Sequence, residues 1–262
     1  MAPECTWVER LIITAGREIL DGQRVFVGTF WPNPVSLFAK RAHARNCTLI
    51  FEGGLVLPKA PLRTPLIASD PCLVASASLA GDVFDTMGML LHGGRADVAL
   101  LSASSVDRFG NINTTCVGDY YRPHVRLAGS GGACDFGSLA RKLIIILEHD
   151  LRRFPERVDY ITTPGYLRGG RSREEAGLPA GTGPTLVVTT LGIFGFDPET
   201  REMVLERIHG GIQVNELVKA VQWPLKVSGS LEEIPSPTEE ELRILREEVD
   251  PCGMYLRDNR FA

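Results

Sequence analysis

A glutamate followed by two glycines closes a short apolar run, Thr48-Leu49-Ile50-Phe51. A carboxylate stays ionised at neutral pH, so Glu52 is a candidate nucleophile that needs no separate base. Gly53 and Gly54 would let the backbone come close to a bound molecule. The plain alternative is a solvated charge at the end of a buried strand. Taken alone, this short stretch leaves both interpretations open.

Two further segments contain more glycine and polar residues than a plain core needs. They run from Ser104 to Asn113 (SSVDRFGNIN) and from Gly129 to Ala133 (GSGGA). Backbone N–H groups of the second segment could form an anion-binding nest, or its glycines could make a tight turn before a helix that starts near Asp135. Each segment follows or borders a predicted strand. Ligands of open α/β sheets sit beyond the carboxyl ends of strands, so the polar segments could converge there.

Helix and strand patterns alternate around these segments. A capping box formed by Thr6 and Glu9 predicts a helix that ends near Gly22. Further helices are predicted over 35–44, 81–91 and a C-terminal segment capped by Thr238, and strands over 24–28, 48–51, 96–102, 112–117, 142–147 and 185–190, with a hairpin over 194–206. The alternation predicts an α/β fold, with an open, largely parallel sheet flanked by helices in one domain over 1–262.

The bulk composition excludes several classes of protein. Of 262 residues, 44% are hydrophobic and 23% charged, as is typical of a soluble globular protein. The net charge of −4 predicts neither a nucleic acid nor a membrane surface as partner. No run of about 18 apolar residues predicts a membrane span. The first residues lack the basic and apolar regions of a signal peptide, so we expect a cytoplasmic protein.

The cysteines and histidines show no metal-ligand spacing. Six cysteines are scattered without a C-x-x-C pair, and five histidines are equally dispersed. We therefore expect reduced structural thiols and no metal site.

An ordered set of motifs runs through nearly the whole chain. It comprises VGTFWPNPVSLFAKR, LIFEGGLV, SVDRFGNINTT, GDYYRP, GSGGACD and the long segment from Asp159 to Asp197. Together these motifs resemble the β subunit of class I coenzyme A transferases, especially the glutaconate coenzyme A-transferase type. Glu52 matches the family's catalytic glutamate. Gly53 departs from the serine of the glutaconate enzyme, and Ser105 stands where a glutamine is common.

The resemblance implies covalent catalysis by Glu52 through a glutamyl-CoA thioester, with coenzyme A as a substrate and no permanently bound cofactor. It also assigns two groups of site residues. The acyl and oxyanion region would contain Gly129, Gly131, Gly132 and Ala133, and further contacts to substrate or coenzyme A would come from Gly28, Ser105, Asn111 and Asn113. The loop from Gly169 to Arg173 could reach coenzyme A phosphates or be a solvated basic loop.

The resemblance also implies a partner, a homologous α subunit in a heterotetramer, and a carboxylic, in particular dicarboxylic, acid as acceptor. Some relatives are acyl-CoA decarboxylases or ring-opening hydrolases, in which another residue tends to replace the glutamate. Glu52 therefore favours transfer. Two alternatives stay open, an acyl-CoA hydrolase or decarboxylase of the same fold and a non-catalytic scaffold subunit.

Overall fold

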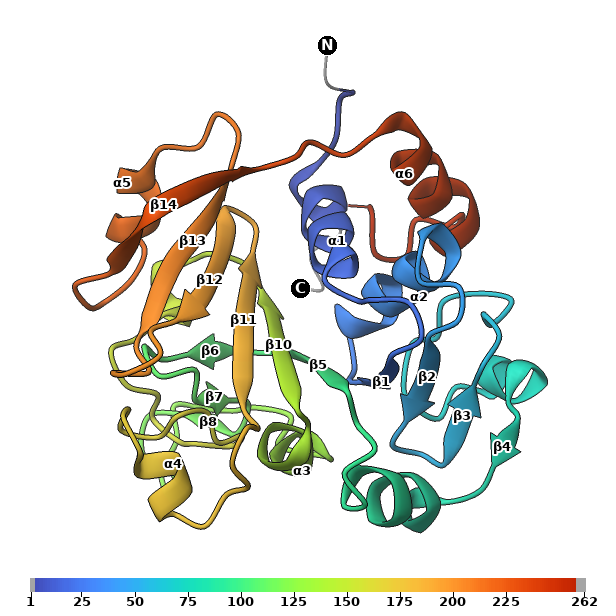
Figure 1. The fold of residues 1–262 in the computed structure, drawn as a ribbon, viewed down its shortest axis with the longest axis horizontal. Coiled ribbons are helices and arrows are strands. Elements are labelled where there is room, and N and C mark those ends of the chain that lie inside the picture. The colour runs from blue at the N-terminus through green and yellow to red at the C-terminus, as the bar shows by residue number, and fades with distance from the viewer. Residues whose placement is uncertain (1–2, 258–262) are drawn as a thin grey trace.

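A ten-stranded sheet organises residues 3–257, which are the residues that the computed structural model describes (Figure 1). Its strands are β1 (Arg24–Val27), β2 (Thr48–Phe51), β3 (Leu55–Leu57), β4 (Leu79–Ala80), β5 (Val98–Ser102), β10 (Lys142–Leu147), β11 (Pro184–Thr189), β12 (Gly192–Phe196), β13 (Met203–His209) and β14 (Lys226–Ile234). Two small hairpins pair β6 (Ser105–Val106) with β7 (Ile112–Asn113) and β8 (Cys116–Val117) with β9 (Val125–Arg126).

The helical elements lie on both faces of this sheet. The α-helices are α1 (Trp7–Arg17), α2 (Pro32–Ala42), α3 (Ala133–Leu139), α4 (Ser172–Glu175), α5 (Val214–Lys219) and α6 (Glu239–Arg243). Short 3-10 helices occur at η1 (Pro71–Ser76) and η3 (Leu151–Arg153), and π-helices at η2 (Phe84–Leu91) and η4 (Ile244–Val249). Within residues 3–257, no helix combines the length and apolar character needed to cross a membrane.

The centre of the sheet is parallel, in the spatial order β2-β1-β5-β10-β11. Antiparallel strands flank this centre, β3 and β4 on one side and β12 and β13 on the other, and β14 pairs parallel to β13. The predicted open, largely parallel α/β sheet is confirmed. Because parallel strands end at one edge, the segments that follow them gather there. The continuous sheet supports a single domain, which we retain as a proposal.

Both faces of the central strands are buried. In β1, Val25 and Val27 join one hydrophobic core while Phe26 joins the other. In β10, Ile144 joins the first core and Ile145 the second. Side chains of a strand alternate between faces, so burial of both explains why these strands are continuous apolar runs. The first core packs under α1, α2 and the C-terminal helices, and the second packs under α3, η2 and α5.

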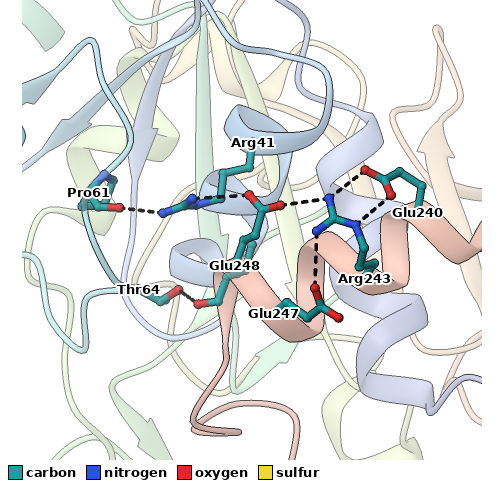
Figure 2. Close-up of polar contacts among 8 residues, drawn as sticks. Arg41, Pro61, Thr64, Glu240, Arg243, Glu247 and Glu248 are labelled. Carbon is teal, nitrogen blue, oxygen red and sulfur yellow. Dashed lines mark hydrogen bonds and ion pairs between the residues drawn. The ribbon is translucent and has the colours of Figure 1, made fainter.

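Polar contacts tie the C-terminal helix to the first half of the chain. Arg243 donates hydrogen bonds to Glu240 and Glu248, and Arg41 donates to the carbonyl of Pro61 at 3.0 Å and to Glu248 at 3.5 Å (Figure 2). Exposed pairs of this kind contribute little individually. Their consequence is positional, because they fix the helix that leads the chain back toward Tyr255.

Three predicted elements differ from the structure. The first helix ends at Arg17, before the turn at Gly22. Residues 81–91 form the π-helix η2 only from Phe84. The strand predicted over 112–117 is interrupted, because the Asn113 side-chain oxygen accepts the N–H groups of Thr115 and Cys116 and turns the chain.

Two half-buried or buried histidines make the fold sensitive to mild acid. Burial lowers the pKa of His149 and of His209 to about 4, whereas an unfolded histidine titrates near about 6.5. Between these values the unfolded chain binds more protons, so the free energy of unfolding falls as the pH decreases. We expect the melting temperature to fall between about pH 7 and 5.5, a window above the usual carboxyl pKa values. His149→Gln should weaken this pH dependence, and exposed His124→Gln should not. A melting temperature that is constant across this window would contradict the assignment.

Candidate active site

Glu52 stands at the carboxyl end of β2, directly after buried Phe51, and its side chain is half-buried. Its Oε2 atom accepts a hydrogen bond from the N–H of Gly132 at 2.8 Å. The Thr86 hydroxyl donates to the Glu52 carbonyl at 3.0 Å. Gly54 completes the turn with a φ of +102°, and a Cβ there would lie 2.4 Å from the Gly81 carbonyl oxygen. The backbone geometry therefore requires glycine at position 54 and directs the carboxylate toward the segment before α3.

A cavity of about 780 Å³ opens beside this carboxylate. Segments that follow parallel strands line it: Gly28 after β1, Glu52 after β2, residues 102–104 after β5 and Glu148 after β10. Gly129, Gly131 and Ala133 line it as well. The structure thus brings the EGG and GSGGA segments together, while the third segment contributes to the wall only through Ser104. A wide cleft at this edge of a parallel sheet is where small-molecule ligands commonly bind.

The GSGGA segment is a tight turn whose backbone also contacts the carboxylate. The N–H of Ala133 donates to the Ser130 carbonyl at 2.9 Å, and α3 begins at Ala133, before the predicted start near Asp135. A Cβ on Gly132 would lie 2.4 Å from Oε2 of Glu52 and 2.8 Å from Cε of Met87. A Cβ on Gly131, whose φ is +46°, would lie 3.5 Å from Oε1. Turn formation and anion contact are therefore two properties of one segment.

Gly28 lines the cavity but has no free backbone donor. Its N–H donates to the Leu100 carbonyl at 3.0 Å, and a Cβ would lie 2.5 Å from that oxygen. The glycine allows β1 and β5 to stay close at the point where both enter the site. A contact from Gly28 to a substrate stays a prediction and would have to use its Cα or carbonyl.

Ser105, Asn111 and Asn113 are outside the residues that line this cavity. The amide of Asn111 donates to both carboxylate oxygens of Asp107 and to the Leu167 carbonyl, and its oxygen accepts the N–H groups of Gly165 and Leu167. Asn113 holds the turn described above. Burial raises the pKa of Asp107. The structure gives both asparagines an internal role, and their predicted contacts with substrate or coenzyme A stay predictions.

Replacing Asn111 by alanine is expected to destabilise the fold more than it slows chemistry. The change leaves the buried Asp107 carboxylate and the N–H groups of residues 165 and 167 without their partner, at about 1–3 kcal/mol for each unsatisfied buried group. Thermal unfolding and turnover per folded molecule should be measured together, with Ser138→Ala, which removes a partly exposed hydroxyl, as control. Normal stability combined with a large loss of turnover would indicate a direct substrate contact instead.

Sequence reasoning missed an aromatic wall. Trp7, Phe30, Trp31 and Tyr255 all line the cavity. The ring centroids of Phe30 and Trp31 lie 4.5 Å apart, and those of Trp7 and Trp31 lie 6.1 Å apart. The rule that strand ends carry ligands could have identified Phe30 and Trp31, which follow β1 closely. Trp7 and Tyr255 come from opposite ends of the chain, where no local pattern marks them.

Arginines at the cavity were missed as well. Arg152 and Arg153 belong to η3, which follows β10, and both line the cavity. Arg153 lies 3.6 Å from Glu148, and Arg152 pairs with Asp150 at 3.0 Å. Within the described chain, no group of three or more His, Cys, Asp or Glu side chains could hold a metal ion. The arrangement combines one anionic oxygen pair, a backbone donor, an aromatic wall and cationic side chains.

Comparison with known proteins extends these observations over nearly the whole chain. Residues 8–220 match the family model described as Coenzyme A transferase. The chain is 34% identical over 238 residues to the B-type subunit of 3-oxoadipate CoA-transferase from Pseudomonas knackmussii, covering 91% of each chain. It is 33% identical over 254 residues to the B-type subunit of glutaconate CoA-transferase from Acidaminococcus fermentans, covering 95% of this chain and 94% of that one. The crystal structure of glutaconate coenzyme A-transferase from the same organism matches with a TM-score of 0.91 at 31% identity, over 98% of this chain and 99% of that chain.

Proposed function

Because the chain belongs to the coenzyme A transferase family, as its motifs predicted, we propose that it moves coenzyme A between an acyl-CoA and a carboxylic acid as the β subunit of a two-subunit enzyme. The observation that carries the mechanism is the Glu52 carboxylate, held by Gly132 N–H at 2.8 Å beside a cavity of about 780 Å³. Glu52 is the nucleophile in this proposal.

The reaction consists of two exchanges at acyl carbons. A carboxylate oxygen of Glu52 attacks the thioester carbonyl, the C–S bond breaks, and coenzyme A leaves as a thiolate from a mixed anhydride. The thiolate then attacks the Glu52 carbonyl carbon, which releases the first acid and leaves coenzyme A on Glu52 as a thioester. A second acid repeats both steps in reverse, so the enzyme and the total number of thioester bonds are regenerated.

Gly132 has a specific task in this scheme. When the thiolate attacks the Glu52 carbonyl carbon, one glutamate oxygen becomes an oxyanion. The Gly132 N–H already donates to Oε2, so it is positioned to stabilise that charge. Losing one such donor typically lowers the rate by about 100- to 1000-fold. Gly129, Gly131 and Ala133 would shape the backbone around the same acyl group.

A partner is needed because the intermediates react with water. The cavity is open in this chain, and a mixed anhydride requires a closed, dry site. The relatives are named as B-type members of two-chain enzymes, which supports a homologous α-type chain as the cover, in a cytoplasmic heterotetramer. The named acids of those relatives, 3-oxoadipate and glutaconate, carry two carboxyl groups. Arg152 and Arg153 support a dicarboxylic acid here too, because guanidinium pairs well with carboxylate. Coenzyme A is a substrate, and the proposal includes no permanently bound cofactor.

Co-expression with the α-type chain tests this proposal. The purified complex should transfer coenzyme A only when both an acyl-CoA donor and a dicarboxylate acceptor are present, and the isolated chain should be inactive. Thioester loss at equal rates with and without acceptor would indicate a hydrolase. Release of carbon dioxide from the acyl group would indicate a decarboxylase. Full transferase activity of the isolated chain would contradict the need for a partner.

A further inference from the structure

A second cavity, of about 220 Å³, lies at the opposite edge of the parallel strands from Glu52. Arg141 and Gly183 line it and immediately precede β10 and β11, whereas Glu52 immediately follows β2. The residues that line the two cavities do not overlap. This second cavity therefore belongs to a different part of the protein from the proposed catalytic site.

Its most unusual component is Arg173, which is only 3% exposed. The two terminal nitrogens of its guanidinium donate five hydrogen bonds, at 2.8–3.0 Å. The acceptors are the carbonyls of residues 137, 138, 164 and 165 and the hydroxyl of Thr182. Among the ion pairs of the described residues, none includes Arg173. A buried charge without a counter-charge is costly, and burial lowers the pKa of this guanidinium.

One donor of Arg173 is still unused. In the described chain its Nε is buried and has no hydrogen-bond acceptor. Nε lies on the side of Gly183, where a Cβ would be 3.2 Å from it. Because position 183 is glycine, with a φ of +122°, no side chain covers this edge of the guanidinium. The edge is therefore available to an acceptor in the cavity that both residues line.

Two more arginines contribute positive charge to this cavity. Arg141 is largely exposed, and its contact with Asp97 is 3.7 Å long, because Asp97 is already bound by Arg24 at 2.8 Å. Arg201 stacks over the ring of Tyr166 at 5.0 Å. The acidic residue that lines the cavity, Glu174, pairs with Arg171 at 3.4 Å. Three arginines thus face one glutamate that already has a partner.

We propose that this second cavity binds a small, doubly charged oxyanion, in the form of a phosphate group. An oxyanion would accept the Nε hydrogen of Arg173 and provide the missing counter-charge. Arg141 and Arg201 would close around its remaining oxygens, as forked guanidinium groups do with phosphate. The volume suits a single phosphate-sized group rather than a whole nucleotide. The inference does not depend on the proposed transferase activity, since its measurement is binding.

Equilibrium dialysis with radiolabelled inorganic phosphate tests the proposal on the full chain in its complex with the α-type chain. Saturable binding is expected at one site per β chain. Arg141→Gln and Arg201→Gln should each weaken it by about 10- to 100-fold, as expected for a charged hydrogen bond. Both side chains are at the surface of the cavity, so these variants should fold. Arg171→Gln is the matched control, because Arg171 lies on the same loop, is largely exposed and does not line the cavity.

The source of the phosphate group is distinguished by competition. Displacement of labelled phosphate by coenzyme A, but not by 3′-dephospho-coenzyme A, would assign the group to the ribose phosphate of the substrate. Displacement by neither would assign free phosphate as the ligand, and both results support the site. Absence of saturable binding, or equal weakening by Arg171→Gln, would overturn the proposal.

Discussion

Replacing Glu52 by glutamine is expected to reduce coenzyme A transfer by a factor on the order of 10⁴ or more, as loss of a nucleophile does in other covalent enzymes. Glutamine keeps the size of the side chain and an oxygen that can still accept the Gly132 N–H. It removes the ionised oxygen that attacks the thioester. The fold and assembly with the partner should therefore persist. Glu52→Asp keeps the charge but withdraws it by one methylene, and a misplacement of about 1 Å can cost about 100-fold.

The labelled intermediate provides the sharpest measurement. Incubating the complex with acyl-CoA but without acceptor should attach coenzyme A to the peptide that contains Phe51-Glu52-Gly53. Borohydride reduction should then fix the change for mass spectrometry. Glu148→Gln is the matched control, because Glu148 is another carboxylate that lines the same cavity. Near-normal transfer by Glu52→Gln, or a label on another peptide, would make Glu52 an ordinary charge at the end of a strand.

Replacing Gly132 by alanine should lower turnover by about 100- to 1000-fold while the fold persists. The φ of Gly132 is −79°, a backbone conformation that alanine adopts readily. The new Cβ, however, would lie 2.4 Å from Oε2 of Glu52 and 2.8 Å from Cε of Met87. The carboxylate must move away, so its hydrogen bond with residue 132 is lost. The effect is therefore expected in kcat rather than in the melting temperature.

Gly131→Ala separates backbone strain from displacement of the carboxylate. At a φ of +46° alanine is strained by roughly 1–2 kcal/mol, yet its Cβ would stay 3.5 Å from Glu52. We expect this variant to lose more stability and less turnover than Gly132→Ala. Kinetics and thermal unfolding of both variants give the comparison. If Gly132→Ala lost stability in proportion to activity, with normal turnover per folded molecule, the segment would be a plain turn.

Local features of the fold were predictable because their causes lie within a few residues. The capping boxes at Thr6 and Thr238 form between residues three apart, and both are present. The strand predicted over 142–147 coincides with β10, since a continuous apolar run suits a strand buried on both faces. The π-helix η2 and the break after Asn113 were not predictable, because they depend on hydrogen bonds that compete with the regular pattern.

The sequence by itself determined that Glu52 ends an apolar strand in a parallel α/β sheet, and its motifs indicated the coenzyme A transferase family. Only the tertiary structure decided what surrounds that carboxylate. The Gly132 donor is 80 residues away along the chain, and Trp7 and Tyr255 reach the same cavity from opposite ends. It also decided that Arg173, predicted on a basic loop, is buried among backbone carbonyls. Periodicity records which side of an element is buried, whereas contacts across the chain follow from how whole elements pack.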